Sequence, residues 1–206
     1  MVENQGLFIT FEGGDGAGKS TQLELLRQWF VDQGREVLTT REPGGTELGA
    51  EIRRLLLHSG DVSPRAEALL YAADRAHHIA TKIRPALAAG KVVLADRYFD
   101  SSVAYQGAAR ALDTKAVRDL SMWAVEGLLP DLTILLDVPV KAGESRVGEV
   151  KDRLEQAGES FHQRVREEFL ALAKTEPERI KVVNGTQTIT EVAADVCAVV
   201  QELLGK

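Results

Sequence analysis

A glycine-rich segment near the start of the chain limits the possible folds more than any other feature. Residues 13–20 read Gly-Gly-Asp-Gly-Ala-Gly-Lys-Ser and match the pattern G-x-x-x-x-G-K-[ST]. An apolar run precedes this segment at 7–12, and a helical pattern follows it at 20–33. Glycine allows the backbone to curl so that successive amides point at phosphate oxygens, and the following helix adds its positive end. The segment therefore predicts a strand, a phosphate loop and a helix that together bind a nucleoside triphosphate.

The roles of single residues in the loop follow from the chemistry of polyphosphate. The Lys19 ammonium can reach the β- and γ-phosphates, and the Ser20 hydroxyl can hold Mg²⁺. We expect the bound triphosphate to contact the whole loop and the residue after it: Gly13, Gly14, Asp15, Gly16, Ala17, Gly18, Lys19, Ser20 and Thr21.

Short apolar runs alternate with longer helical patterns along the rest of the chain. The runs are apolar on both faces, as strands of a parallel sheet are, and lie at 7–12, 36–40, 92–95, 132–136 and 180–183. Helical patterns lie at 20–33, 46–57, 63–89, 114–127, 159–174 and 190–204, the third kinked or interrupted near Pro85. The alternation predicts an α/β, three-layer fold of the phosphate-loop NTPase kind, with a mostly parallel five-stranded sheet between helices.

Size and composition restrict the class of protein further. A chain of 206 residues with 44% apolar residues suits a single domain spanning 1–206. A net charge of -6 and a pI of about 5.3 argue against a dedicated nucleic-acid binder. Cys197 is the one cysteine, and no run has membrane-spanning length. We therefore expect a cytoplasmic protein without nucleic-acid or membrane partners.

The charged segment at about 140–158 has few large apolar residues and forms either a mobile lid or a solvated helix pair. Its cations include Arg146, Lys151 and Arg153. In a lid, these side chains would neutralise charge on the transferred phosphate. On a solvated helix they would simply face water.

Two carboxylates follow predicted strands directly, at Asp96 and Asp137. Ligands of open α/β sheets bind at the carboxyl ends of the strands, so either residue could orient Mg²⁺. Asp96 is followed by Arg97, which could clamp a phosphate. Asp137 leads into Pro139 and could serve only as a turn residue. The pattern does not decide between the two carboxylates.

Two further segments are candidates for a second ligand. Residues 40–46 form a Pro-Gly-Gly loop after the second predicted strand, either lining an acceptor site or forming a plain turn. Tyr71, Asp74 and Arg75 share one side of a predicted helix. They could stack on and hydrogen-bond a base, or they could be a core tyrosine beside a surface charge pair.

Taken together, the motifs resemble those of the bacterial thymidylate kinase family, which phosphorylates dTMP with ATP. The resemblance runs nearly end to end and is carried by Thr-Arg-Glu-Pro-Gly-Gly-Thr at 40–46, Asp-Arg-Tyr at 96–98 and Ala-Tyr-Gln-Gly at 104–107. It implies the γ-phosphate of ATP as the group transferred, dTMP as acceptor, Mg²⁺ as cofactor and a homodimer formed through helix faces.

The resemblance also implies roles for single residues. Asp15 lies near the acceptor's 3'-hydroxyl and phosphate, Arg53 and Arg97 hold the dTMP phosphate, and Tyr71 stacks on thymine. Arg75 hydrogen-bonds a thymine carbonyl near Ser102, and Tyr105 crowds a 2'-hydroxyl. The acceptor site expected in full comprises Glu42, Pro43, Arg53, Leu57, Tyr71, Arg75, Arg97, Ser101, Ser102 and Tyr105.

The catalytic arginine is expected in the lid. One branch of the family carries an arginine in the phosphate loop, where this chain has Gly16. By resemblance the chain belongs to the other branch, whose arginine comes from the lid. Arg153 is the first candidate for the transferring phosphate and Arg146 the second, although Arg146 could instead stack on adenine. Gly185 lies in a segment similar to the family's adenine contact.

Three other functions share parts of this pattern. A different nucleotide or nucleoside kinase would carry the same phosphate loop, and only the acceptor motifs argue against it. A GTP-dependent switch would need an Asn-Lys-x-Asp segment, which the sequence lacks. An ATP-binding subunit of a nucleic-acid machine would be expected to carry a basic stripe.

Overall fold

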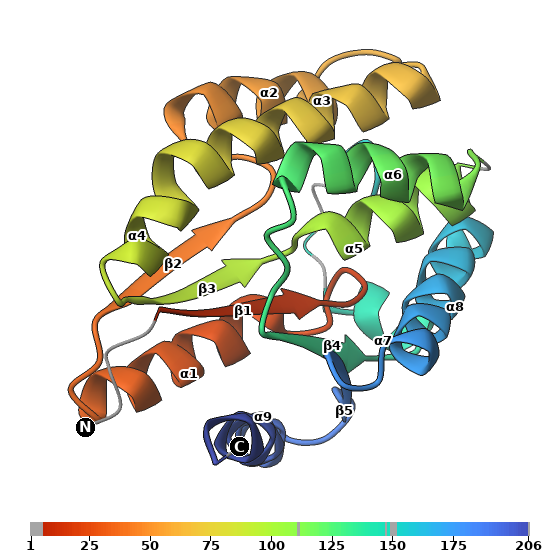
Figure 1. The fold of residues 1–206 in the computed structure, drawn as a ribbon. Helices are drawn as coiled ribbons and strands as arrows, with labels where there is room; N and C mark the ends of the chain where they lie inside the picture. Colours follow the sequence, from red (N-terminus) through yellow and green to blue (C-terminus); the bar gives the residue numbers. More distant parts are fainter. Residues whose placement is uncertain (1–5, 111, 147, 149–151, 206) are drawn as a thin grey trace.

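The computed structural model describes residues 6–110, 112–146, 148 and 152–205, in which strands and helices alternate (Figure 1). The strands are β1 (Leu7–Glu12), β2 (Val37–Arg41), β3 (Val92–Asp96), β4 (Leu132–Asp137) and β5 (Ile180–Asn184). The helices are α1 (Lys19–Asp32), α2 (Glu47–His58), α3 (Pro64–His78), α4 (Arg84–Ala88), α5 (Phe99–Ser102), α6 (Thr114–Val125), α7 (Val140–Glu144), α8 (Glu159–Thr175) and α9 (Ile189–Leu204). Two π-helical segments, η1 (Ile79–Ile83) and η2 (Val103–Ala109), continue α3 and α5.

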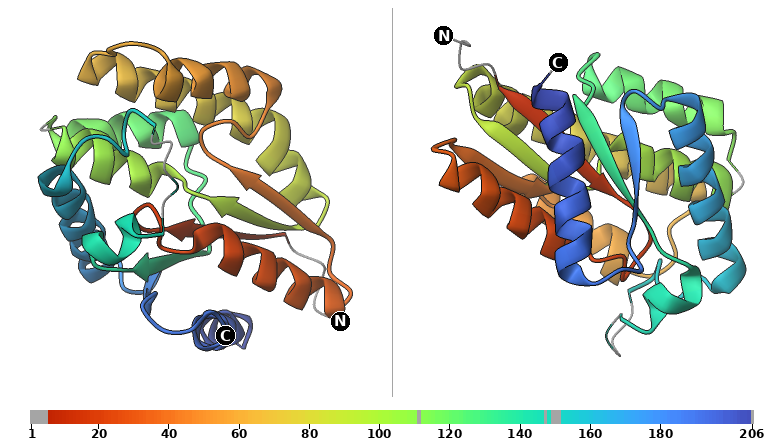
Figure 2. Two further views of the ribbon diagram at one scale, coloured as in Figure 1. Left: turned by 180° about the vertical axis from the view of Figure 1, so that it is seen from behind. Right: turned by 90° about the horizontal axis from the view of Figure 1, so that it is seen from below.

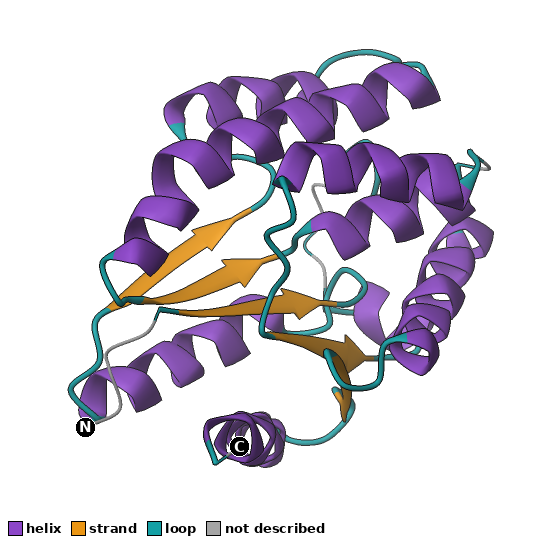
Figure 3. Ribbon diagram, viewed as in Figure 1, coloured by secondary structure: helices purple, strands orange, loops and turns teal. Residues whose placement is uncertain are grey.

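The strands form one sheet in the order β2-β3-β1-β4-β5, and each described strand runs parallel to its neighbours. In Figure 3 the arrowheads of β2, β3, β1 and β4 point to the same edge. The chain passes from β1 to β2 and β3 on one side and later returns to β4 on the other. A crevice opens at such a switch point, so the segment after β1 lies where ligands bind in open α/β sheets.

Two apolar cores lie on opposite faces of the sheet because successive side chains of a strand point to opposite faces. Leu7, Ile9 and Phe11 of β1 belong to the core under α1 and α9. Phe8 belongs to the larger core under α2, α3, α5, α6 and α8. Figure 2 shows α1 and α9 side by side across the first face. Both faces are thus covered, which explains why the strands lack a polar face.

The structure confirms the α/β prediction and the five strands to within one residue at each end. The helix expected at 63–89 consists of α3, η1 and α4 in continuous succession. Pro85 stands at the start of α4, where its missing amide hydrogen changes the helical bonding without ending the helix. The short elements α5, η2 and α7 were not predicted, since four to seven residues carry too little periodicity.

The expected lid contains α7 and a series of turns from Asp152 to the start of α8. Lys151 lies outside the described residues. None of the described helices is long and apolar enough to cross a membrane.

Candidate active site

The phosphate loop connects β1 to α1 and lines a cavity of about 740 Å³. Gly13, Gly16 and Gly18 have φ of 135°, 72° and 92°, which side chains disfavour. Gly18 is the N-cap of α1 and offers no side chain, so the first amides of the helix stay available to an anion. The loop therefore has the form expected of a polyphosphate site.

Lys19 lies beneath this loop with its ammonium group turned toward the loop carbonyls. Its Nζ donates to the Gly14 oxygen at 2.9 Å and to the Gly13 oxygen at 3.2 Å. Burial lowers the pKa of Lys19, and the Arg97 charge lowers it further. A bound polyphosphate would restore favourable charge to this buried ammonium.

Two expected Mg²⁺ ligands meet at the carboxyl edge of the sheet. The Ser20 hydroxyl donates to Asp96 Oδ2 at 3.1 Å, and both residues line the cavity. Asp137, the rival carboxylate, instead accepts two hydrogen bonds from Arg166 at 2.7 and 2.9 Å and does not line this cavity. The geometry thus favours Asp96 over Asp137. Hydroxyl and carboxylate oxygens suit a hard cation such as Mg²⁺.

Arg97 joins the phosphate loop to the helices on the other side of the cavity. Its Nη1 donates to the Gly13 oxygen at 3.0 Å and to Ser101 Oγ at 3.1 Å. Its Nη2 donates to Asp15 Oδ1 at 2.6 Å and to the Tyr105 hydroxyl at 3.2 Å. Burial on its own would raise the pKa of Asp15, but Arg97 and Lys19 hold it below its ordinary value.

The turn that carries Arg97 is anchored by a carboxylate that the sequence analysis missed. Glu12 ends β1 and is fully buried. It accepts from the Tyr98 amide at 2.8 Å, from the Ser101 amide at 3.2 Å and from Ser101 Oγ at 2.6 Å. Burial, together with the Asp100 charge, raises the pKa of Glu12 to about 7. An acidic residue at the end of an apolar strand was the signal for this role.

The opposite wall of the cavity contains every residue expected at the acceptor site. They come from the β2–α2 loop, α2, α3, the β3–α5 turn, α5 and η2: Glu42, Pro43, Arg53, Leu57, Tyr71, Arg75, Arg97, Ser101, Ser102 and Tyr105. Arg53 reaches back across the loop, where its Nη1 donates to the Pro43 oxygen at 3.1 Å. Burial lowers the pKa of Arg53, and nearby Arg41 lowers it further. An anion between Arg53 and Arg97 would relieve this accumulation of positive charge.

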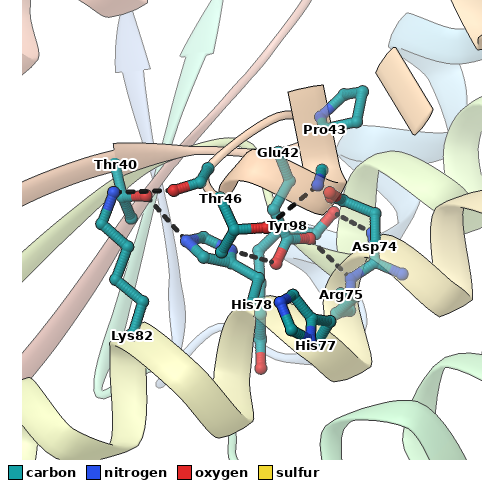
Figure 4. A network of polar contacts seen from close by, with 12 residues as sticks. Thr40, Glu42, Pro43, Thr46, Asp74, Arg75, His77, His78, Lys82 and Tyr98 are labelled. Carbon is teal, nitrogen blue, oxygen red and sulfur yellow. Dashed lines mark hydrogen bonds and ion pairs between the residues drawn. The ribbon is translucent and has the colours of Figure 1, made fainter. Parts of the chain in front are cut away.

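Glu42 organises the buried side of this wall (Figure 4). Its Oε2 accepts from Arg75 Nε at 2.7 Å, and its Oε1 lies 3.0 Å from His78 Nδ1. His78 Nε2 lies 2.7 Å from Thr40 Oγ1. A carboxylate only accepts, so His78 Nδ1 is the donor in the contact with Glu42. These contacts fix Arg75 from behind.

Arg75 and its neighbour Asp74 are both fully buried, which rules out the surface charge pair considered from the sequence. Arg75 Nη2 donates to Ser102 Oγ at 3.1 Å, whereas Nη1 has no partner among the described residues. Asp74 Oδ1 accepts from the Gly44 amide at 3.3 Å, and its Oδ2 also lacks a partner there. Arg75 lines the cavity, and its unpartnered Nη1 is itself buried.

The two lid arginines lie in different places. Arg146 lines the cavity, and its Nη1 donates to the Gly185 oxygen at 3.1 Å. Arg153 is not among the described lining residues. Its Nη2 donates to Glu67 Oε2, and its Nε donates to the Leu56 oxygen. The structure therefore brings Arg146 into the cavity beside Gly185 and leaves Arg153 outside it, bonded to Glu67 and Leu56.

Helix α7, which lies in the expected lid, packs directly on the phosphate loop. A Cβ added at Gly16 would fall on the Gly143 carbonyl oxygen, and one added at Gly143 would lie 2.6 Å from the Asp15 oxygen. Only two glycines allow backbone to meet backbone so closely.

Sequence reasoning missed several residues of the site. Gln106 lines the cavity and is almost fully buried, and Glu67 lies behind it. Further residues near Gly185 also line the cavity: Gln187, Thr188, Ile189 and Val192. A polar residue in an otherwise apolar helical stretch was the available signal for Gln106 and Glu67.

Comparisons with known proteins agree with this geometry. A family model described as "Thymidylate kinase" matches residues 11–196. A protein named thymidylate kinase from Leifsonia xyli subsp. xyli is 61% identical over 195 residues, covering 93% of this chain and 92% of that protein. Another from Clavibacter michiganensis subsp. michiganensis is 58% identical over 203 residues, covering 97% and 96%. The crystal structure of thymidylate kinase from Ehrlichia chaffeensis superposes with a TM-score of 0.79 at 33% identity, covering 95% of this chain and 99% of that one.

Proposed function

The chain belongs to the thymidylate kinase family, and from this premise we propose how its residues carry out the family's reaction. It is a phosphotransferase that moves the γ-phosphate of ATP to dTMP, giving dTDP and ADP, in the synthesis of dTTP for DNA replication. The observation that carries the assignment of residues is the position of Arg97. It bonds the phosphate loop through Gly13 and Asp15 and the acceptor wall through Ser101 and Tyr105.

We propose that the phosphate loop holds the ATP tail through its main-chain amides and that Lys19 neutralises the β- and γ-phosphates. Lys19 Nζ would leave the Gly13 and Gly14 oxygens, which hold it in this structure, for the phosphate oxygens. Arg146 and the residues from Gly185 to Val192 line the side of the cavity suited to adenosine. The expected role of Arg153 at the transferring phosphate stays a prediction.

Ser20 and Asp96 are the residues proposed to hold Mg²⁺, directly or through its waters. Bound there, the ion would supply positive charge to the β- and γ-phosphate oxygens.

The acceptor is held by cations at one end and by the wall of α3 at the other. Arg53 and Arg97 would bind the dTMP phosphate and reduce its repulsion from ATP, while Tyr71 and Arg75 meet the base.

An oxygen of the dTMP phosphate then attacks the γ-phosphorus, a new P–O bond forms, and the bond to the β-phosphate oxygen breaks. No side-chain nucleophile is needed, because catalysis comes from positioning and charge neutralisation. Closure of the proposed lid, 140–158, would exclude water as a competing acceptor.

The direct test is an assay of ADP production from ATP and Mg²⁺ with a panel of nucleoside monophosphates as acceptors. We expect dTMP to give the highest kcat/KM. A higher value with dCMP, AMP or GMP would overturn the assignment of the acceptor wall, and ADP release that needs no acceptor would overturn the kinase assignment.

We also propose a homodimer in the cytoplasm. Leu48 and Leu55 of α2, Leu69 of α3 and Trp123 of α6 are all exposed, Trp123 to 79%, on helices of one face. Covering such a surface with a second copy would bury large apolar area. The single cysteine suits a reducing compartment. Light scattering on the eluted protein should give twice the chain mass of 22.4 kDa, and a single-chain mass would contradict the dimer.

A further inference from the structure

A buried carboxylate lies behind the base end of the cavity, where the proposed reaction gives it no role. Glu67 of α3 is fully buried. Its Oε2 accepts from Arg153 Nη2 at 2.5 Å, and its Oε1 accepts from Gln106 Nε2 at 2.9 Å. Arg110 Nε lies 3.4 Å from the same Oε1. Two arginines therefore surround the Glu67 carboxylate, and Gln106 is the neutral member of the cluster.

The charge on Glu67 determines which way the Gln106 amide faces. An ionised carboxylate can only accept hydrogen bonds, so the NH₂ end of the amide must turn toward Glu67. Gln106 lines the cavity together with Tyr71, Arg75 and Ser102. Because the nitrogen is bonded to Glu67, the amide oxygen, Oε1, is the polar atom of Gln106 left for a ligand.

The wall therefore offers a donor and an acceptor to the edge of a bound base. The guanidinium of Arg75, which lines the cavity, is the donor, and Gln106 Oε1 is the acceptor. Thymine complements this pair, because its C4 carbonyl oxygen accepts from Arg75 and its N3–H donates to Gln106. Cytosine has an amino donor in place of the carbonyl oxygen and an acceptor in place of the N3–H, so it would meet donor with donor and acceptor with acceptor.

We propose that Glu67 is a positioning residue that sets base specificity, by fixing the Gln106 amide so that its oxygen receives the thymine N3–H. This inference rests on the proposed function. Glu67 does not touch the base; it acts through Gln106.

The substitution Glu67→Gln tests this polarity directly. Arg153 would keep the new amide oxygen at the Oε2 position, which leaves an NH₂ group facing Gln106. Two NH₂ groups cannot bond each other, so Gln106 would turn over and present its own NH₂ to the cavity. A donor there suits the bare N3 of cytosine. We expect the preference in kcat/KM for dTMP over dCMP to fall about tenfold or more, the scale of one mismatched hydrogen bond.

The acceptor dUMP serves as a matched control substrate, because it shares the thymine C4 carbonyl and N3–H and lacks only the methyl group. Its kcat/KM relative to dTMP should change less than about twofold in Glu67→Gln. A variant that lost activity equally toward dTMP, dUMP and dCMP would show a merely structural Glu67 and would overturn the inference.

Two further variants isolate the route through Gln106. Gln106→Met keeps the shape of the side chain without its hydrogen bonds and should lower the dTMP-over-dCMP preference by itself. Adding Glu67→Gln to Gln106→Met should change that preference no further, since the residue through which Glu67 acts is gone. If Gln106→Met kept the wild-type preference, the inference would fall, even if Glu67→Gln did not fold.

Glu176→Gln is the matched control variant. Glu176 is also held by two arginines, Arg118 and Arg179, at 2.8 Å each, but it does not line the cavity. Its base preference should equal that of the wild-type protein. Wild-type protein without dTMP phosphorylation would refute the proposed function itself, whereas an active wild type with an unchanged preference in both variants would refute only the role of Glu67.

Discussion

The phosphate loop and the acceptor wall face each other across one cavity, but they are built differently. The loop is a single stretch of chain whose proposed binding groups are main-chain amides and Lys19. The wall collects side chains from separate elements and fixes them through buried carboxylates, Glu42 behind Arg75 and Glu67 behind Gln106. The loop can therefore lose its key side chain and keep its shape, whereas the wall depends on each ion pair for its shape.

Glu42→Gln should produce the largest effect of all the substitutions, and the quantity affected is the stability of the fold. Removing the charge leaves the buried Arg75 guanidinium without its counter-ion, a change that destabilises proteins by about 3–5 kcal/mol. The measurement is the free energy of unfolding in denaturant. Glu36→Gln, which removes an exposed carboxylate paired with Lys91, should leave the unfolding midpoint unchanged. Equal unfolding midpoints for Glu42→Gln and Glu36→Gln would contradict the claim that the buried ion pair stabilises the protein more than the exposed one.

Lys19→Ala should lower kcat by at least about a hundredfold, the scale of one lost electrostatic stabiliser. Its stability should stay level or rise, because burial lowers the pKa of Lys19 and keeping it charged works against folding. Lys115→Ala, an exposed lysine paired with Asp119, is the control for both measurements. Near-normal turnover in purified Lys19→Ala protein would refute the role of the ammonium group.

Asp74→Asn sharpens the comparison through its pH dependence. Burial, together with the Glu42 charge, raises the pKa of Asp74 from 3.8 to about 6, although His78 and Arg75 pull it down. The folded state binds this proton more tightly than the unfolded chain does. Its contribution to the free energy of unfolding is therefore fully present below about pH 4 and is lost as the pH rises through about 6. The asparagine variant should therefore match wild type at pH 4 and exceed it by at most about 3 kcal/mol at pH 8. A variant less stable at pH 8 would contradict a raised pKa.

Arg75→Ala should give the smallest of the kinetic effects, chiefly in binding of the base, although it breaks the buried pair with Glu42 just as Glu42→Gln does. We expect the KM for dTMP to rise about tenfold with a smaller change in kcat, because the donor acts on the base and not on the transferred phosphate. Steady-state kinetics with dTMP and dCMP measure this. An unchanged preference between these acceptors would remove Arg75 from base selection.

The same difference explains what could be predicted from the sequence. The loop occupies consecutive positions, so one motif predicted its strand, its curl and its helix, and the apolar runs predicted every strand of the sheet. Glu12, Glu67 and Gln106 are far apart in sequence from the residues they support, and only the fold brings them together. The acceptor residues were identified by resemblance, because no spacing rule relates Arg53 to Arg97. The choice between Asp96 and Asp137 likewise needed the partner of Asp137, which is Arg166 from α8.

The contact between Gly16 and Gly143 restricts which segment can supply an arginine to the phosphate site. Any side chain at position 16 would meet the Gly143 carbonyl, so an arginine in the phosphate loop would have to push α7 away. In this backbone, therefore, the phosphate loop cannot carry an arginine at position 16 while α7 stays packed against it. Grafting the arginine of the other branch onto this chain would require rebuilding α7 at the same time, because a side chain at position 16 and the Gly143 carbonyl cannot occupy the same space.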